Sequence, residues 1–135
     1  MPIVFIAHSK QVAAWGGDVG LGKNIFLLAA ADDADAVAAF LASKPCGAED
    51  WVLIKKEDVD NADAETLQNK LAGKEKRVDP NLYPRLRGFQ GVFKVKIENV
   101  ENHLMIKKAL EGEAPKVIKA KPVDIAGYLL QNALK

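Results

Sequence analysis

Short apolar runs recur along the chain, separated by polar stretches and by segments with helical spacing. A run of four to eight apolar residues without a polar face is typical of a strand buried on both sides. Together with one alternating segment, these runs predict five strands, at residues 2–7, 25–30, 51–54, 92–98 and 117–120. The clearest is 92–98, where apolar residues at 93, 95 and 97 alternate with charged residues at 94, 96 and 98.

Segments with apolar residues at helical spacing predict four helices. The first begins after Asp32 or Asp33, residues that suit an N-cap, and ends before Pro45. The other three cover residues 63–72, 99–111 and 123–134. Residues 8–24 contain four glycines and no clear periodicity, so we expect a loop there with at most one helical turn.

The order of these elements predicts a single α+β domain over residues 1–135. Strand–helix–strand occurs twice, at 25–54 and at 92–120. Two such units in one antiparallel sheet, with helices packed on one face, form an α/β sandwich of the ferredoxin-like kind. The alternative is a small doubly wound α/β sheet, because strands alternate with helices throughout.

Composition is that of a globular protein, with 49% hydrophobic and 27% charged residues. Cys46 is the only cysteine, which excludes an internal disulfide, and the amino terminus lacks the pattern of a secretory signal, so we expect a cytoplasmic protein without membrane segments. The net charge of +1 conceals a net charge of −6 in residues 1–67 and +7 in residues 68–135. We expect the two halves to interleave and give a mixed surface; the alternative is one basic face.

The three arginines of the chain lie within eleven residues, in a segment stiffened by prolines. Guanidinium groups bind oxyanions in a bidentate manner, a tyrosine stacks on rings, and lysines add positive charge. We therefore predict an anion-binding basic loop, for a small anionic ligand or an acidic protein partner, with candidate residues Arg77, Tyr83, Arg85, Arg87, Lys94 and Lys96. Nucleic acid is less favoured, because Phe93 lies on the face opposite the lysines. The alternative is a solvated basic edge that carries no ligand.

A small enzyme is the alternative function, with a site near His8 and the glycine loop at 16–22. Residues 17–23 match the first seven positions of a phosphate-binding loop, but Asn24 replaces the expected Ser or Thr, and no strand directly precedes the loop. The two histidines and Cys46 lack zinc spacing. We assign no catalytic residue, cofactor or metal.

Self-association is the remaining prediction. The last helix carries an apolar face wider than one side of a small core requires: Ile125, Tyr128, Leu129, Leu130, Ala133 and Leu134. This face predicts a homodimer, and the alternative is that the helix packs deeply into its own core. In the helix at 99–111 we place the core-facing side at Met105, Ile106, Ala109 and Leu110.

Overall fold

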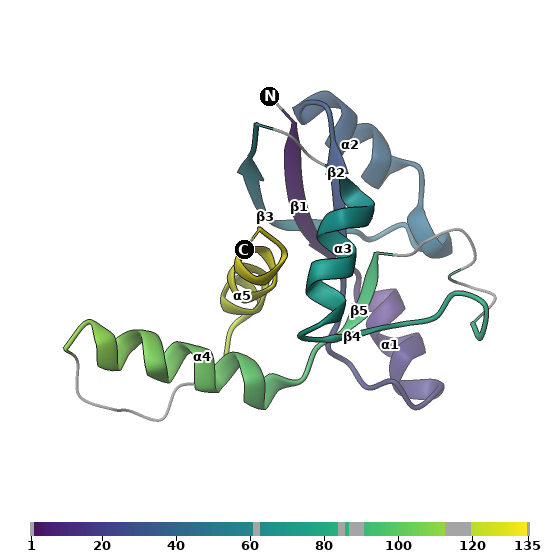
Figure 1. The fold of residues 1–135 in the computed structure, drawn as a ribbon. Helices are drawn as coiled ribbons and strands as arrows, with labels where there is room; N and C mark the ends of the chain where they lie inside the picture. The colour runs from purple at the N-terminus through teal and green to yellow at the C-terminus, as the bar shows by residue number, and fades with distance from the viewer. Residues whose placement is uncertain (1, 61–62, 84–85, 87–90, 113–119, 135) are drawn as a thin grey trace.

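A computed structural model describes residues 2–60, 63–83, 86, 91–112 and 120–134. Within them, five strands form one open sheet in the order β3-β1-β2-β5-β4 (Figure 1). The strands are β1 (Ile3–His8), β2 (Ile25–Ala31), β3 (Val52–Asp58), β4 (Lys76–Arg77) and β5 (Val92–Lys94). The helices are α1 (Lys10–Asp18), α2 (Ala34–Ala42), α3 (Ala64–Ala72), α4 (Ile97–Leu110) and α5 (Pro122–Leu134), with a 3-10 turn at Pro45–Gly47.

Every pairing between neighbouring strands is antiparallel within the described residues. The mixed α+β class is therefore confirmed, and the doubly wound parallel alternative is wrong. β1 lies between β2 and β3 and runs opposite to both. The first strand–helix–strand unit is thus split, because β1 separates the two strands that α2 connects. The last predicted strand, 117–120, lies almost entirely outside the described residues.

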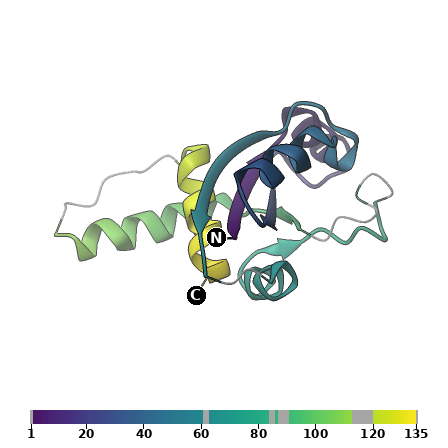
Figure 2. The same ribbon diagram turned by 90° about the horizontal axis from the view of Figure 1, so that it is seen from above.

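Helices cover both faces of the sheet: α3 and α5 lie on one side, and α1 and α2 on the other (Figure 2). Residues of β1 alternate between the two cores, with Val4 and Ile6 toward α5 and Ile3, Phe5 and Ala7 toward the opposite side. Two covered faces explain why the run is apolar at every position. Helices on both faces also distinguish this fold from the expected ferredoxin-like sandwich, in which all helices share one face.

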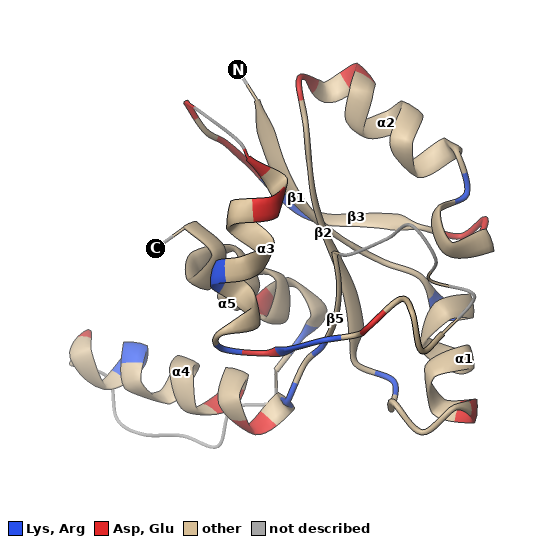
Figure 3. Ribbon diagram, turned by 45° about the vertical axis from the view of Figure 1, so that its right-hand side comes forward, with Lys and Arg blue, Asp and Glu red and all other residues tan. Residues whose placement is uncertain are grey.

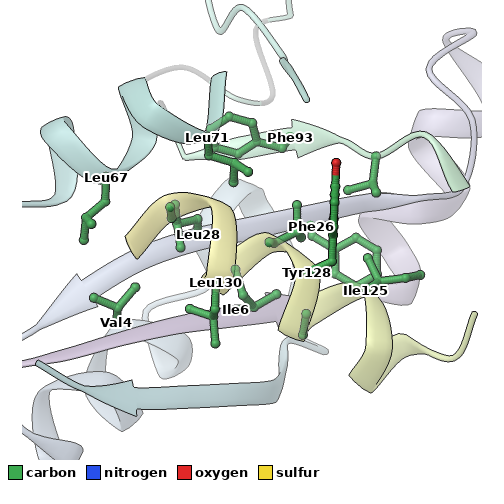
Figure 4. Packing of buried hydrophobic residues seen from close by; sticks show 14 of the residues in the cluster. Val4, Ile6, Phe26, Leu28, Leu67, Leu71, Phe93, Ile125, Tyr128 and Leu130 are labelled. Carbon is green, nitrogen blue, oxygen red and sulfur yellow. The ribbon is translucent and has the colours of Figure 1, made fainter. Parts of the chain in front are cut away.

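α5 is the centre of the core on its side of the sheet. Figure 4 shows Ile125, Tyr128 and Leu130 surrounded by side chains of β1, β2, β5 and α3. Leu129 and Ala133 have no exposed surface, and each fully buried leucine contributes about 1.5–3 kcal/mol to folding. The wide apolar face of α5 is thus buried within its own chain, so the observation that predicted a homodimer has this other explanation.

Two segments differ from their sequence predictions for local reasons. α1 is a complete helix where we expected a loop, since the Ser9 side chain caps it by accepting a hydrogen bond from the Val12 N–H at 3.1 Å. The alternating segment 92–98 is a strand only as far as Lys94, and Ile97 already belongs to α4. The cause is the chain turning at Lys96, where the Glu75 carboxylate accepts the backbone N–H at 2.9 Å.

Candidate functional site

Four lysines line a pocket of about 580 Å³ where β4 and β5 meet the start of α4. They are Lys74, Lys76, Lys94 and Lys96, and we call this site the lysine pocket. Figure 3 shows the two lysine-bearing segments next to each other at the end of β5. The remaining wall is formed by two asparagines, two glutamates and two aliphatic residues. The volume lies within the range of about 300–1,000 Å³ that is usual for small-molecule sites.

Strand register brings the lysines together. Lys76 of β4 is the antiparallel partner of Lys94 of β5, and partners in such a ladder point to the same face. Lys74 lies in the turn that follows α3 and Lys96 is the N-cap residue of α4, so both are outside the strands, and both line the same pocket. The alternate residues, Arg77 and its partner Phe93, point to the opposite face.

A buried carboxylate organises the floor of the pocket. Glu75 is 4% exposed, and its two oxygens accept hydrogen bonds from the Lys96 backbone N–H at 2.9 Å and the Asn99 side-chain amide at 3.0 Å. Both donors lie at the beginning of α4, so Glu75 ties this helix to the end of α3. The N-terminus of a helix carries a partial positive charge, and here it adds to the field of the lysines.

The pocket has an excess of positive charge. Like charges directly opposite each other in a sheet are destabilising, and Lys76 and Lys94 stand in that relation. Among the residues that the structure describes, the only ion pair within 4.0 Å is Lys44–Glu49, which is elsewhere. Glu75 and Glu98 line the pocket and offset two of the four positive charges. The remaining charge favours an anionic ligand.

The residues predicted from the sequence divide between several places. Lys94 and Lys96 line the pocket. The Arg77 guanidinium lies 5.8 Å from the centre of the Phe93 ring and donates a 2.8 Å hydrogen bond to the Asn69 side chain, on the other face.

Tyr83 contacts Trp15 edge-on, with ring centroids 5.6 Å apart, so at least one side of its ring already has a protein partner. Arg85 and Arg87, the other two predicted arginines, lie outside the described residues. The structure therefore brings two of the six candidates, Lys94 and Lys96, together in a pocket whose positive charge comes from lysines.

Sequence reasoning missed Lys74 and Lys76. The signal was present, because Lys-Glu-Lys at 74–76 repeats the Lys-x-Lys spacing of 94–96. Two segments with lysines at alternate positions place them on one face if the segments pair in register. Nothing local shows that they pair, however, since eighteen positions separate Lys76 from its partner Lys94.

His8 and the glycine segment lie toward opposite ends of α1. His8 ends β1 before the start of that helix, whereas Gly16 and Gly17 lie in its last turn and Gly20 and Gly22 follow it. The segment ends a helix and precedes β2, whereas a phosphate-binding loop connects a strand to the helix that it begins. The Gly16 carbonyl instead accepts the N–H groups of Leu21 and Gly22, which ends α1.

The groups around His8 form a helix cap. The Ser9 hydroxyl donates to the Asp50 carboxylate, which also accepts the Gln11 N–H at 3.0 Å. Burial lowers the pKa of His8, the charge of Asp50 opposes this shift, and Lys10 adds to it. Although burial alone raises the pKa of Asp50, the hydrogen bonds from Ser9 and from backbone N–H groups outweigh it and lower the pKa overall. This cluster is explained by the start of α1.

Comparison with protein-family models, curated proteins and solved structures found no match to this chain. Across the described residues, none of the helices combines the length and apolar character that a membrane span requires. Within the same residues, no three His, Cys, Asp or Glu side chains are grouped as metal ligands would be.

Proposed function

We propose that this protein binds a small, multiply charged oxyanion in the lysine pocket. The observation that carries the proposal is the convergence of four lysines, none in an ion pair within 4.0 Å in the described part of the chain, on one pocket of about 580 Å³. If these lysines served only solubility, placing Lys76 directly opposite Lys94 would destabilise the sheet without any benefit. A bound anion would neutralise the two charges and so remove the repulsion that destabilises the sheet.

The chemistry of the pocket supports binding more than catalysis. Its described lining residues are Asn, Lys, Glu, Val and Ile, without a His, Cys, Ser, Thr or Tyr. Of the two glutamates, Glu75 has both oxygens engaged in hydrogen bonds. Lysines act as mobile point charges toward phosphate or carboxylate groups. We therefore propose a binding protein, and the predicted cytoplasmic location and homodimer stay predictions beside it.

The proposal is tested by thermal unfolding in the presence of sulfate, inorganic phosphate or citrate at fixed ionic strength. The variant Lys76→Gln plus Lys94→Gln removes the central pair. A matched control, Lys55→Gln plus Lys56→Gln, removes the same charge from exposed positions on β3, at the other edge of the sheet.

A ligand present at a hundred times its Kd stabilises the folded state by about 2.7 kcal/mol. We expect at least one of these anions to raise the unfolding temperature of the wild type and of the β3 control, and to do so much less in the pocket variant. Equal shifts in all three proteins, or no shift of the wild type with any anion, would contradict the proposal.

A further inference from the structure

We infer that the ligand of the lysine pocket carries at least two linked phosphoryl groups, an inference that rests on the proposed function. The four lysines form two successive pairs. Lys76 and Lys94 are register partners and make the inner pair. Lys74 and Lys96 each lie two residues beyond them in the sequence, also line the pocket, and make the outer pair.

The dimensions of the two pairs suit a chain of phosphoryl groups. Directly opposite residues of an antiparallel ladder have Cα atoms about 4.5–5.5 Å apart. Two residues of extended chain, as from Lys94 to Lys96, advance about 6.6 Å. Lysine side chains are long enough for both members of a pair to reach one group between them. A single tetrahedral anion engages one pair, whereas two or three linked phosphoryl groups extend from the inner to the outer pair.

The charge of the pocket points the same way. Four lysines against Glu75 and Glu98 leave a net charge of +2, and the start of α4 adds its partial charge. Glu75 has both oxygens occupied by the hydrogen bonds that hold the start of α4. The surplus is therefore spread over two lysine pairs and is neutralised best by a ligand whose negative charge is equally extended.

The pocket also has space beside the phosphoryl groups. Asn24 and Asn99 offer side-chain amides, and Ile97 offers a half-buried aliphatic surface. These groups suit an organic substituent that has both polar edges and an apolar face. Two sources of the shared chemistry follow, an inorganic polyphosphate and a nucleoside polyphosphate.

Titration calorimetry at constant ionic strength, with phosphate, pyrophosphate, tripolyphosphate and ADP as probes, tests the inference. We expect pyrophosphate to bind the wild type at least ten times more tightly than phosphate. Replacing the outer pair, Lys74→Gln plus Lys96→Gln, is expected to abolish most of this preference while phosphate binding to the inner pair changes little. The Lys→Arg versions of the same two substitutions keep the charge and are expected to keep the preference. The β3 control, Lys55→Gln plus Lys56→Gln, should behave as the wild type.

The outcomes separate the inference from the function beneath it. Equal affinity for phosphate and pyrophosphate, or a preference that survives loss of the outer pair, would overturn the inference and leave anion binding intact. The absence of binding by every probe would overturn the inference, and it would overturn the proposed function as well if sulfate and citrate also failed to stabilise the wild type. Tighter binding of ADP than of pyrophosphate assigns the ligand to the nucleoside polyphosphates, and the reverse order assigns it to inorganic polyphosphate.

Discussion

Replacing Gly16 with alanine tests whether the glycine segment is structural. Gly16 lies in α1 against β2, and a Cβ added there would be 2.1 Å from the Ile25 Cδ1 and 2.6 Å from the Gly22 carbonyl oxygen. Neither neighbour moves easily, because Ile25 is 1% exposed and the Gly22 oxygen belongs to the backbone. Alanine therefore forces α1 away from β2 and strains the hydrogen bonds that end the helix at the Gly16 carbonyl.

The expected loss follows from two opposing effects. An alanine in place of a helical glycine gains up to about 1 kcal/mol in helix propensity. Overpacking of a close-packed site costs about 1–3 kcal/mol, and more where backbone atoms collide. Because one of the two collisions involves backbone, we expect Gly16→Ala to lower the free energy of unfolding by about 1–2 kcal/mol.

Gly17 supplies the matched control. It is the next residue of the same helix, and a Cβ there would meet nothing within 4 Å. Gly17→Ala gains helix propensity without a collision and should raise the free energy of unfolding by about 0.5–1 kcal/mol. Urea unfolding followed by the fluorescence of Trp15 and Trp51 measures both variants, and their midpoints should differ by about 1 M or more. A Gly16→Ala variant as stable as Gly17→Ala would refute the close packing of α1 on β2.

Three further predictions concern charge, pH and association. Without ligand, Lys76→Gln should stabilise the fold by about 0.2–1 kcal/mol in thermal unfolding at low salt, because it removes a like-charge cross-strand pair. This gain in stability should disappear at about 1 M NaCl, where charges are screened. Burial lowers the pKa of His8, so the unfolded state takes up the proton first and the free energy of unfolding should fall as the pH drops below about 6.5. His8→Gln should flatten this dependence of stability on pH, measured by urea unfolding. A dependence that persists in the variant would contradict its assignment to His8. We expect the predicted homodimer to form through α4, where Ile106 is 62% and Leu110 84% exposed. Light scattering should then give twice 14.6 kDa for the wild type, and Ile106→Lys should halve that mass. A wild-type mass of 14.6 kDa at high micromolar concentration would refute the homodimer.

The existence of the strands was predictable where the signal was local. The runs in β1 and β2 are apolar at each position, and the structure buries both sides of these strands in two separate cores. Their order was not predictable, because pairing of β1 between β2 and β3 depends on contacts distant in sequence. α1 was missed for a related reason. Adjacent Gly16 and Gly17 disfavour a helix, and the packing of Val12 against the sheet overrides that preference.

The two C-terminal helices show where periodicity misleads. In α4 we placed the core-facing side at residues 105, 106, 109 and 110, yet all four are exposed, and Val100 is the only buried residue of that helix. Figure 2 shows why, since the C-terminal part of α4 extends beyond the edge of the sheet. A helical apolar stripe shows that a face is suited to burial. It does not show whether the chain's own core reaches that far.

The lysine pocket could not be predicted in full because it depends on how the two oppositely charged halves meet. We expected them to interleave, and α5 of the basic half does pack against β1 and β3 of the acidic half. Within the sheet, however, the strands stay apart, with β3, β1 and β2 from the acidic half together and β5 and β4 from the basic half at the other edge. Charge asymmetry along the chain thus becomes a basic edge in space, where register sets Lys76 opposite Lys94. The arginines predicted a site because they are close to one another in sequence. The lysines instead converge because β4 pairs with β5, and the loop between these two strands contains most of the arginines. A charge pattern can therefore predict an anion site only together with the strand register.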